Sequence, residues 1–129
     1  MREIVVLLSL LMAPLAKANQ LHCVAQAVYH EARGEPERCQ RMVADVVLNR
    51  VKHRSYPSTA CGVVYQRSQF SWTKNRPRIA DKAAWHKSIS VARQQMRGTR
   101  TTHAIYFTRG TRFGLVVDSC GKHIFMREV

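Results

Sequence analysis

Acidic side chains are scarce in this 129-residue chain, and two of them flank a glycine in a way that suits acid–base chemistry. Only eight Asp and Glu residues occur, and Glu31 and Glu35 lie on either side of Gly34. Glu31 is expected at the C-terminal end of a helix, where the negative end of the helix dipole raises the pKa of a carboxyl group. A carboxyl group that keeps its proton can act as a general acid. The alternatives are an ion pair of Glu31 with Arg33 or Arg50, and a capping role for Glu35 at the start of the next helix.

The other reactive residue types in the chain form no recognisable site. His30 and Glu31 begin like the HExxH motif of zinc proteases, but Gly34 stands where the second His is required. Ser71 lacks the G-x-S-x-G context of a serine hydrolase, and no two cysteines have zinc-finger spacing. We therefore expect no metal site and no other cofactor.

Two aromatic residues, Phe70 and Trp72, lie in an arginine-rich segment, residues 66–78, that is expected to be a long surface loop. The axial C–H groups of a sugar ring offer an apolar surface on which an aromatic ring can stack, so both side chains are candidate glycan contacts. Folding of the two rings into the core is the alternative.

Hydrophobic periodicity predicts three helices that would position these residues. They cover residues 21–32, 36–52 and 82–96. The first ends before Gly34, and the third is capped by Asp81 and has Met96 on its buried side. Residues 59–65 form a short apolar element that fits either a helix or a strand.

Short β-type runs follow the helices in the C-terminal part of the chain. They cover residues 104–107, 115–117 and 123–125. Gly110, Gly114 and Gly121 separate them, as is typical of turns. Helices first and short strands last predict a single α+β domain.

The first eighteen residues have the composition of a secretory signal peptide. Arg2 precedes an apolar run over residues 4–12, and Ala16-Lys17-Ala18 has the small-x-small pattern that signal peptidase recognises. The run is shorter than the roughly 20 residues that a membrane-spanning helix needs. We expect residues 1–18 to be removed and residues 19–129 to be exported to the periplasm or beyond. A retained anchor and a buried N-terminal helix are the alternatives.

Export changes how the cysteines are interpreted. All four, Cys23, Cys39, Cys61 and Cys120, lie after residue 18, and an even number in a small exported domain predicts two disulfides. If the first two helices form a hairpin that turns near Gly34, Cys23 and Cys39 lie too far apart to bond. That pairing is disfavoured, and the other pairings stay open.

The net charge of the chain is +13, and the segment through Ala18 contributes +1 of it, which leaves +12 for the exported part. Such an excess favours binding to polyanions, which for an exported protein are anionic envelope polymers. The basic residues are spread along the chain rather than gathered into one tract, which argues against nucleic acid as a partner. Solubility alone is the alternative explanation of the charge. We expect a monomer.

Five segments, in order along the chain, resemble motifs of the cell-wall hydrolase family that includes the spore-cortex-lytic enzymes. They are AVYHEARGE at 27–35, VVLNRV at 46–51, YPSTACGVVYQ at 56–66, QFSW at 69–72 and GKHIF at 121–125. Together they cover nearly all of the chain after residue 18. The sequence departs from many relatives after QFSW, where Thr73-Lys74-Asn75 replaces a Cys and an acidic-Gly pair.

The resemblance implies a compact, lysozyme-like α+β fold, stabilised here by disulfides, that acts on peptidoglycan. The first Glu of EARGE is the catalytic acid of that family, which corresponds to Glu31. Five residues of the shared motifs are then expected to contact the substrate. They are Asn49, Phe70, Ser71, Trp72 and His123.

A single catalytic carboxylate favours one mechanism over others. None of Asp45, Asp81 and Asp118 has a motif context that would make it a second catalytic group, although most glycosidases need two carboxylates. We therefore expect a lytic transglycosylase that cleaves the β-1,4 bond between N-acetylmuramic acid and N-acetylglucosamine. A hydrolytic muramidase and a basic protein that binds envelope polymers without cutting them are the alternatives.

Overall fold

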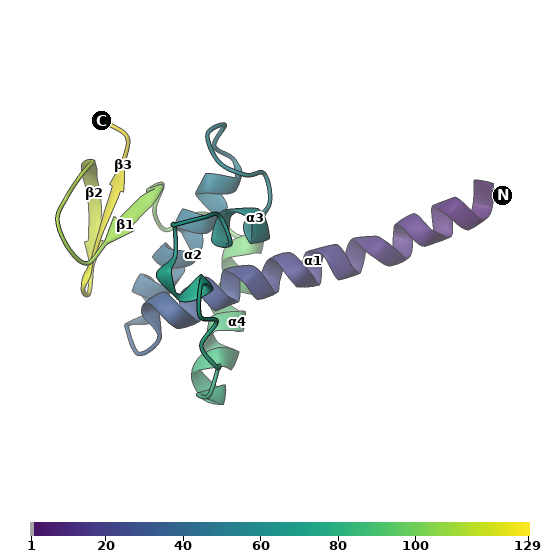
Figure 1. Ribbon diagram of the computed structural model, residues 1–129, viewed down its shortest axis with the longest axis horizontal. Helices are drawn as coiled ribbons and strands as arrows, with labels where there is room; N and C mark the ends of the chain where they lie inside the picture. The colour runs from purple at the N-terminus through teal and green to yellow at the C-terminus, as the bar shows by residue number, and fades with distance from the viewer. Residues whose placement is uncertain (1) are drawn as a thin grey trace.

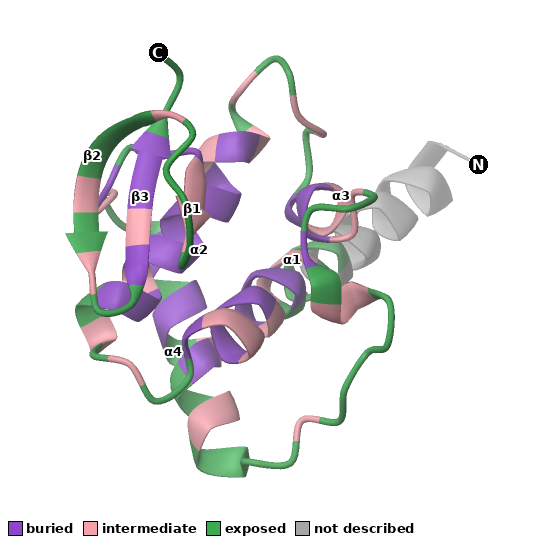
Figure 2. Ribbon diagram, turned by 60° about the vertical axis from the view of Figure 1, so that its left-hand side comes forward, coloured by how far each residue is buried: buried purple, intermediate pink, exposed green. Residues whose placement is uncertain are grey.

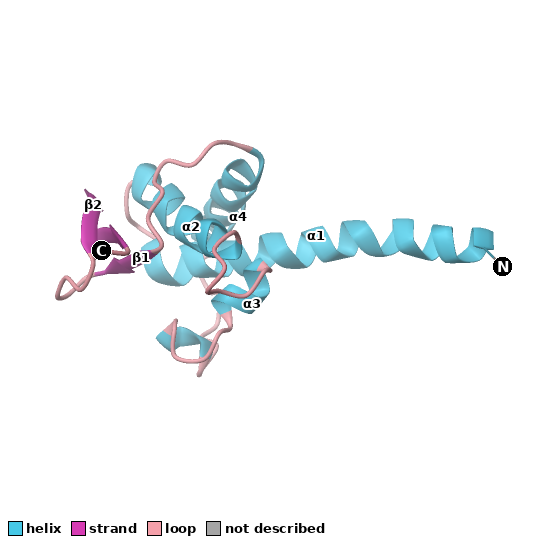
Figure 3. Ribbon diagram, turned by 90° about the horizontal axis from the view of Figure 1, so that it is seen from above, coloured by secondary structure: helices cyan, strands magenta, loops and turns pink. Residues whose placement is uncertain are grey.

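The computed structural model describes the backbone of residues 2–129 and the side chains of residues 16–129. Helices fill the first part of the chain and a small sheet the last, with the sheet at one end of the helical part (Figures 1 and 3). The elements in chain order are α1 (Arg2–Ala32), α2 (Glu37–Val51), α3 (Ala60–Val64), the 3-10 helix η1 (Ser71–Thr73), α4 (Lys82–Arg97), β1 (Tyr106–Thr108), β2 (Leu115–Cys120) and β3 (His123–Arg127). The α+β prediction is confirmed.

Helix α1 ends at Ala32 as expected but begins at Arg2, well before the predicted start at Leu21. The expected signal peptide falls mostly on residues whose side chains are outside the described part, so its removal stays a prediction. In the part of the chain whose side chains are described, no helix is both long and apolar enough to cross a membrane.

The core forms where the C-terminal half of α1 packs against α2, α3 and α4. Side chains of α1 and α2 that recur at helical spacing are fully buried there, as Figure 2 shows by colour. The main ones are Val24, Val28, Val43, Val46 and Val47. The apolar periodicity therefore predicted the buried faces of both helices, because burial of such a stripe is what stabilises a helix in a domain.

Helix α4 is capped as predicted, since the Asp81 side chain accepts a hydrogen bond of 2.9 Å from the Ala84 backbone N–H. The prediction that Met96 is buried is wrong, because 36% of it is exposed. Its neighbour Gln95 turns inward instead and donates a hydrogen bond of 2.6 Å to the buried carboxylate of Asp45. A buried carboxylate needs such partners, so this contact favours burial of Gln95 over Met96.

The three strands form one antiparallel sheet in the order β1-β3-β2, which makes β2 an edge strand. A bulge interrupts its pairing with β3 between Val116 and Asp118. The ambiguous segment 59–65 contains helix α3, whose N-terminus is capped by the hydroxyl of Thr59.

Two disulfides join the elements, as predicted from the cysteine count. Cys23 of α1 bonds to Cys61 of α3, and Cys39 of α2 bonds to Cys120 at the end of β2, with Cα–Cα distances of 5.1 and 5.4 Å. The pairing of Cys23 with Cys39, which the hairpin argument disfavoured, does not occur. The second disulfide fastens the sheet to the helical part.

Candidate active site

A cleft of about 340 Å³ lies where the end of α1 meets the loop after α3 and the sheet. Its lining includes Glu31, residues 68–71 and Lys74 of the loop, residues 107–109 of the sheet side, and Arg50 and His123. The structure therefore brings together residues that are up to about ninety positions apart, with the predicted acid among them.

Glu31 is held in a state that favours its protonated form. Burial raises the pKa of the Glu31 carboxyl, whereas the nearby charge of Arg109 and the indole N–H of Trp72 lower it, and Glu35 raises it slightly further. The direction agrees with the sequence argument, but the leading cause is removal from water rather than the helix dipole. The raised pKa suits a general acid.

The alternative ion pairs of Glu31 do not form. The guanidinium of Arg33 lies over the ring of Tyr29, 4.7 Å from its centre. Arg50 is buried and donates to the backbone carbonyl of Ile105 at 2.7 Å and to the side chain of Gln69 at 3.2 Å. Both cations are therefore engaged elsewhere.

Every other carboxylate with a described side chain has a hydrogen-bond or ion-pair partner. Asp45 accepts from Gln95 and from two backbone N–H groups, Asp81 caps α4, and Asp118 pairs with Arg38 at 3.2 Å. Glu37 pairs with Arg41 and Lys87, Glu128 with His53, and Glu35 with His123. Among the side chains of residues 16–129, Glu31 alone is a carboxylate without an ion pair or a regular hydrogen bond; only the indole N–H of Trp72 approaches it, and it faces the cleft.

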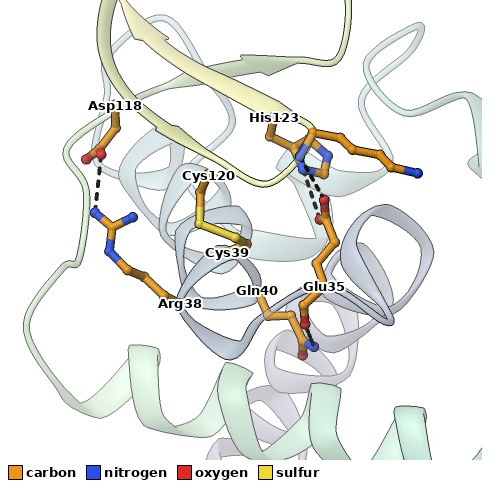
Figure 4. Close-up of a disulfide and its surroundings, with 8 residues drawn as sticks. Glu35, Arg38, Cys39, Gln40, Asp118, Cys120 and His123 are labelled. Carbon is orange, nitrogen blue, oxygen red and sulfur yellow. Dashed lines mark hydrogen bonds and ion pairs between the residues drawn. A yellow bond between two sulfur atoms is a disulfide. The ribbon is translucent and has the colours of Figure 1, made fainter.

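Glu35 does not cap α2, so the alternative of a capping role does not hold. The N-cap residue of α2 is Pro36, and no side chain caps the helix. The carboxylate of Glu35 instead turns to the sheet, where its Oε2 lies 3.0 Å from Nδ1 of His123 (Figure 4). The capping rule uses only local sequence and could not anticipate a histidine 88 positions away.

Four of the predicted substrate-binding residues lie in or beside the cleft. Phe70, Ser71 and His123 line it, although Phe70 and His123 are buried and only 4% and 1% exposed. Trp72 is half-buried and stacks on His30 with ring centres 4.4 Å apart. Its indole N–H is buried and has no regular hydrogen-bond acceptor among the described residues, yet it approaches the Glu31 carboxyl. Trp72 therefore lies next to the Glu31 carboxyl group, and its ring is partly covered by His30 rather than fully open for stacking on a sugar.

Asn49, also expected to contact the substrate, is not among the residues that line the cleft. Its amide donates to the backbone carbonyls of Thr102 and Ala104 at 3.0 and 2.8 Å, and its carbonyl accepts from Arg100. Both hydrogens of its amide are used in tying α2 to the segment before β1, which gives Asn49 a structural role.

Arg109 and Lys74 also line the cleft, although neither was predicted from the sequence as a site residue. Arg109 donates to the backbone carbonyl of Glu31 from the other end of the chain. No local pattern marks either residue among the 21 Lys and Arg residues, so only the tertiary fold identifies them. Among the described residues, no three His, Cys, Asp or Glu side chains converge as metal ligands would.

The profile of the Cell Wall Hydrolase family matches residues 34–126. The chain belongs to the cell-wall hydrolase family. The match begins three residues after Glu31, so it covers the cleft and the sheet but does not itself include the candidate acid.

Cell-wall hydrolases with similar sequences include two spore cortex-lytic enzymes. The one from Oceanobacillus iheyensis is 37% identical over 76 residues, which are 59% of this chain and 25% of the relative. The one from Bacillus cereus is 45% identical over 53 residues, 41% of this chain and 20% of the relative. The chain therefore spans about a quarter or less of the length of these curated relatives.

Two solved cell-wall hydrolase domains have the same fold. The catalytic domain of the Bacillus cereus SleB protein superposes with a TM-score of 0.72 at 28% identity, covering 85% of this chain and 91% of that domain. The catalytic domain of the germination-specific lytic transglycosylase SleB from Bacillus anthracis gives 0.72 at 29%, covering 84% and 94%. These matches confirm the expected lysozyme-like α+β architecture.

Proposed function

We propose that this protein cleaves the glycan strands of peptidoglycan, with Glu31 as the catalytic acid. The observation that carries the proposal is the isolation of Glu31, which lines the cleft without an ion pair and has a raised pKa. The likeness to catalytic domains of spore cortex-lytic proteins supports peptidoglycan as the substrate.

The reaction we propose is that of a lytic transglycosylase. Glu31 donates its proton to the oxygen that bridges N-acetylmuramic acid and N-acetylglucosamine, and the acetamido group of the muramic residue stabilises the positive charge that develops. The ionised Glu31 then removes the proton of the C6 hydroxyl of the same residue, whose oxygen closes onto C1. Because the remaining described carboxylates are engaged in other contacts, a scheme with one carboxylate fits this cleft better than one with two. The similarity to a domain described as a lytic transglycosylase favours the same outcome.

Mass spectrometry of the soluble fragments released from purified peptidoglycan tests the proposal. A transglycosylase leaves 1,6-anhydromuramic ends, which weigh one water less than the reducing ends that a muramidase leaves. Reducing ends alone would replace the transglycosylase with hydrolysis. No fragments at all would favour the third alternative, a monomeric basic protein that binds peptidoglycan and other anionic envelope polymers without cutting them.

We also propose that the protein is exported and begins at Asn19 after removal of residues 1–18. The basis is the short apolar run followed by Ala16-Lys17-Ala18. The intact mass of protein recovered from the periplasm or the medium should correspond to residues 19–129. Recovery of the full-length chain from the cytoplasm alone would contradict the proposal.

Replacement of Trp72 with Phe should shift the pH dependence of the reaction upward. The indole N–H lowers the pKa of Glu31, so a ring without that N–H leaves the pKa higher. Since a general acid must start protonated, the loss of activity at alkaline pH should then occur at a higher pH than in the wild type. The measurement is fragment release across a pH series.

Trp72→Ala serves as the comparison for this test. It removes the stacking on His30 as well as the N–H, so it should also lower the thermal midpoint, which Trp72→Phe should leave nearly unchanged. An unchanged alkaline limb in Trp72→Phe would mean that the indole does not act on Glu31.

A further inference from the structure

A chain of contacts runs from Glu35 through His123 and Arg109 to Glu31. Nδ1 of His123 lies 3.0 Å from Oε2 of Glu35, and both atoms are buried and make no regular hydrogen bond among the described residues, so this contact is the one available to them. On the opposite side of the ring, Nε of Arg109 donates to Nε2 of His123 at 3.3 Å. A terminal nitrogen of the same guanidinium donates to the backbone carbonyl of Glu31.

The contacts determine which nitrogen of His123 carries the proton. A guanidinium can only donate, so Nε2 must accept and carries no hydrogen. Burial lowers the pKa of His123 and the charge of Arg109 lowers it too, although Glu35 acts in the opposite direction. We infer that the ring is neutral, with its hydrogen on Nδ1, the nitrogen that lies 3.0 Å from the Glu35 carboxylate.

The turn between β2 and β3 packs against Glu35 and helps to keep its side chain next to His123. Gly121, in the turn between β2 and β3, has φ +57°, and a Cβ atom there would lie 2.9 Å from Oε1 of Glu35. The next residue, Lys122, donates its backbone N–H to the same oxygen at 3.3 Å. The Cys39–Cys120 disulfide joins the two segments directly beside these contacts (Figure 4). Glycine is favoured here because its φ is positive, and a side chain at this position would also press on the Glu35 carboxylate.

We propose that Glu35, His123 and Arg109 act as a positioning chain that fixes the guanidinium of Arg109 beside the catalytic carboxyl group. Glu35 and His123 are positioning residues in this proposal, because neither needs to touch the scissile bond. The inference rests on the proposed function, in which Glu31 is protonated before bond cleavage and ionised after it. A cation held next to Glu31 stabilises the ionised form at the stage when the acid has given up its proton.

Several other groups lie around Glu31 in addition to Arg109. Trp72 approaches from η1, Lys74 lines the cleft from the loop, and Arg50 lines it from α2. Glu35 adds a negative charge from the turn after α1. Of the cations that line the cleft, Arg109 is the one whose charge lowers the pKa of Glu31, so its placement should matter most.

Substitutions at Glu35 separate positioning from a direct catalytic role. In Glu35→Gln the amide oxygen can still accept the hydrogen from Nδ1 of His123, at the loss of the long 3.3 Å bond from the Lys122 N–H, so the variant should keep activity within about threefold of the wild type. Glu35→Ala loses the acceptor and should lose about tenfold or more, because a small misplacement at a catalytic site is costly. If Glu35→Gln were as inactive as Glu31→Gln, Glu35 would be a second catalytic carboxylate and the positioning proposal would be overturned.

Arg109→Gln tests the last residue of the positioning chain, with Arg112→Gln as the matched control. Arg112 lies in the same loop between β1 and β2, is exposed and does not line the cleft. Arg109→Gln should lower kcat about tenfold or more with a smaller change in KM, and it should move the alkaline limb of activity to higher pH. Equal behaviour of the two variants would overturn the proposal.

Nitrogen NMR of the His123 ring gives a readout that does not depend on activity. In the exported chain at neutral pH, His123 should be neutral with the hydrogen on Nδ1, and Arg109→Gln should shift it toward the Nε2-protonated form. A doubly protonated ring, or a hydrogen on Nε2 in the wild type, would overturn the proposal. If NMR finds the hydrogen on Nδ1 but the wild type releases no fragments, the proposed function is wrong, while the Glu35–His123–Arg109 contacts are still supported.

Discussion

Glu31→Gln should lower the release of fragments from peptidoglycan by about 10²–10⁴-fold, since general acid catalysis contributes on that order. Gln has the size of Glu and can donate a hydrogen bond, but it has no acidic proton to deliver. At 1.36 kcal/mol per tenfold, the barrier should rise by at least about 2.7 kcal/mol. The measurement is the initial rate of fragment release at the pH optimum of the wild type, with circular dichroism to verify folding.

Glu128→Gln is the matched control for this substitution. Glu128 is exposed, pairs with His53 and lies outside the cleft, so the same chemical change there should leave the rate nearly unaltered. Fragment release by folded Glu31→Gln within tenfold of the wild type would show that another group supplies the proton.

Removal of either disulfide should cost several kcal/mol of stability, but only one of the two should matter for the cleft. With sequence separations of 81 and 38 residues, the loss of chain restriction corresponds to about 4.5 kcal/mol for Cys39–Cys120 and about 3.9 kcal/mol for Cys23–Cys61. The two paired Cys→Ser variants are therefore nearly matched in stability. Urea unfolding followed by circular dichroism measures both values.

The rate of fragment release by each variant, measured under conditions in which it is still folded, then separates the effects of the two disulfides on the cleft. The Cys39–Cys120 disulfide holds Glu35 and His123 together, so its loss should reduce fragment release in protein that is still folded. The Cys23–Cys61 disulfide joins α1 to α3 outside the cleft lining, and its loss should leave the rate of the folded protein close to that of the wild type. Equal losses of activity would assign both bonds to stability alone.

The sequence was most informative where local rules govern the structure. The end of α1 near Ala32, the cap of α4 at Asp81 and the buried stripe of α2 follow from side-chain periodicity and capping chemistry within a few residues. Glu31 could be selected for a related reason, because it ends a helix beside a glycine that turns the chain with φ +83°.

Features set by distant contacts could not be predicted. Gln95 rather than Met96 is buried because Asp45, fifty residues earlier, needs a donor. Asn49 carries a motif position, yet its amide is used to fix the backbone of residues 102 and 104. Arg109 donates a hydrogen bond to Glu31, which lies 78 positions earlier in the sequence, and no periodicity or spacing predicts such a contact.

The edge strand β2 has a consequence for how this protein behaves when it is concentrated. Leu115, Val116 and Val117 are 46%, 37% and 40% exposed on an unpaired sheet edge, which is the kind of surface that invites strand-to-strand aggregation. Two features counter it. The bulge after Val116 breaks the regular spacing that an incoming strand would need, and the ion pair of Asp118 with Arg38 sets two charges beside it. The bulge and the ion pair thus protect the exposed apolar side chains of β2 from pairing with another strand, although these side chains are not buried.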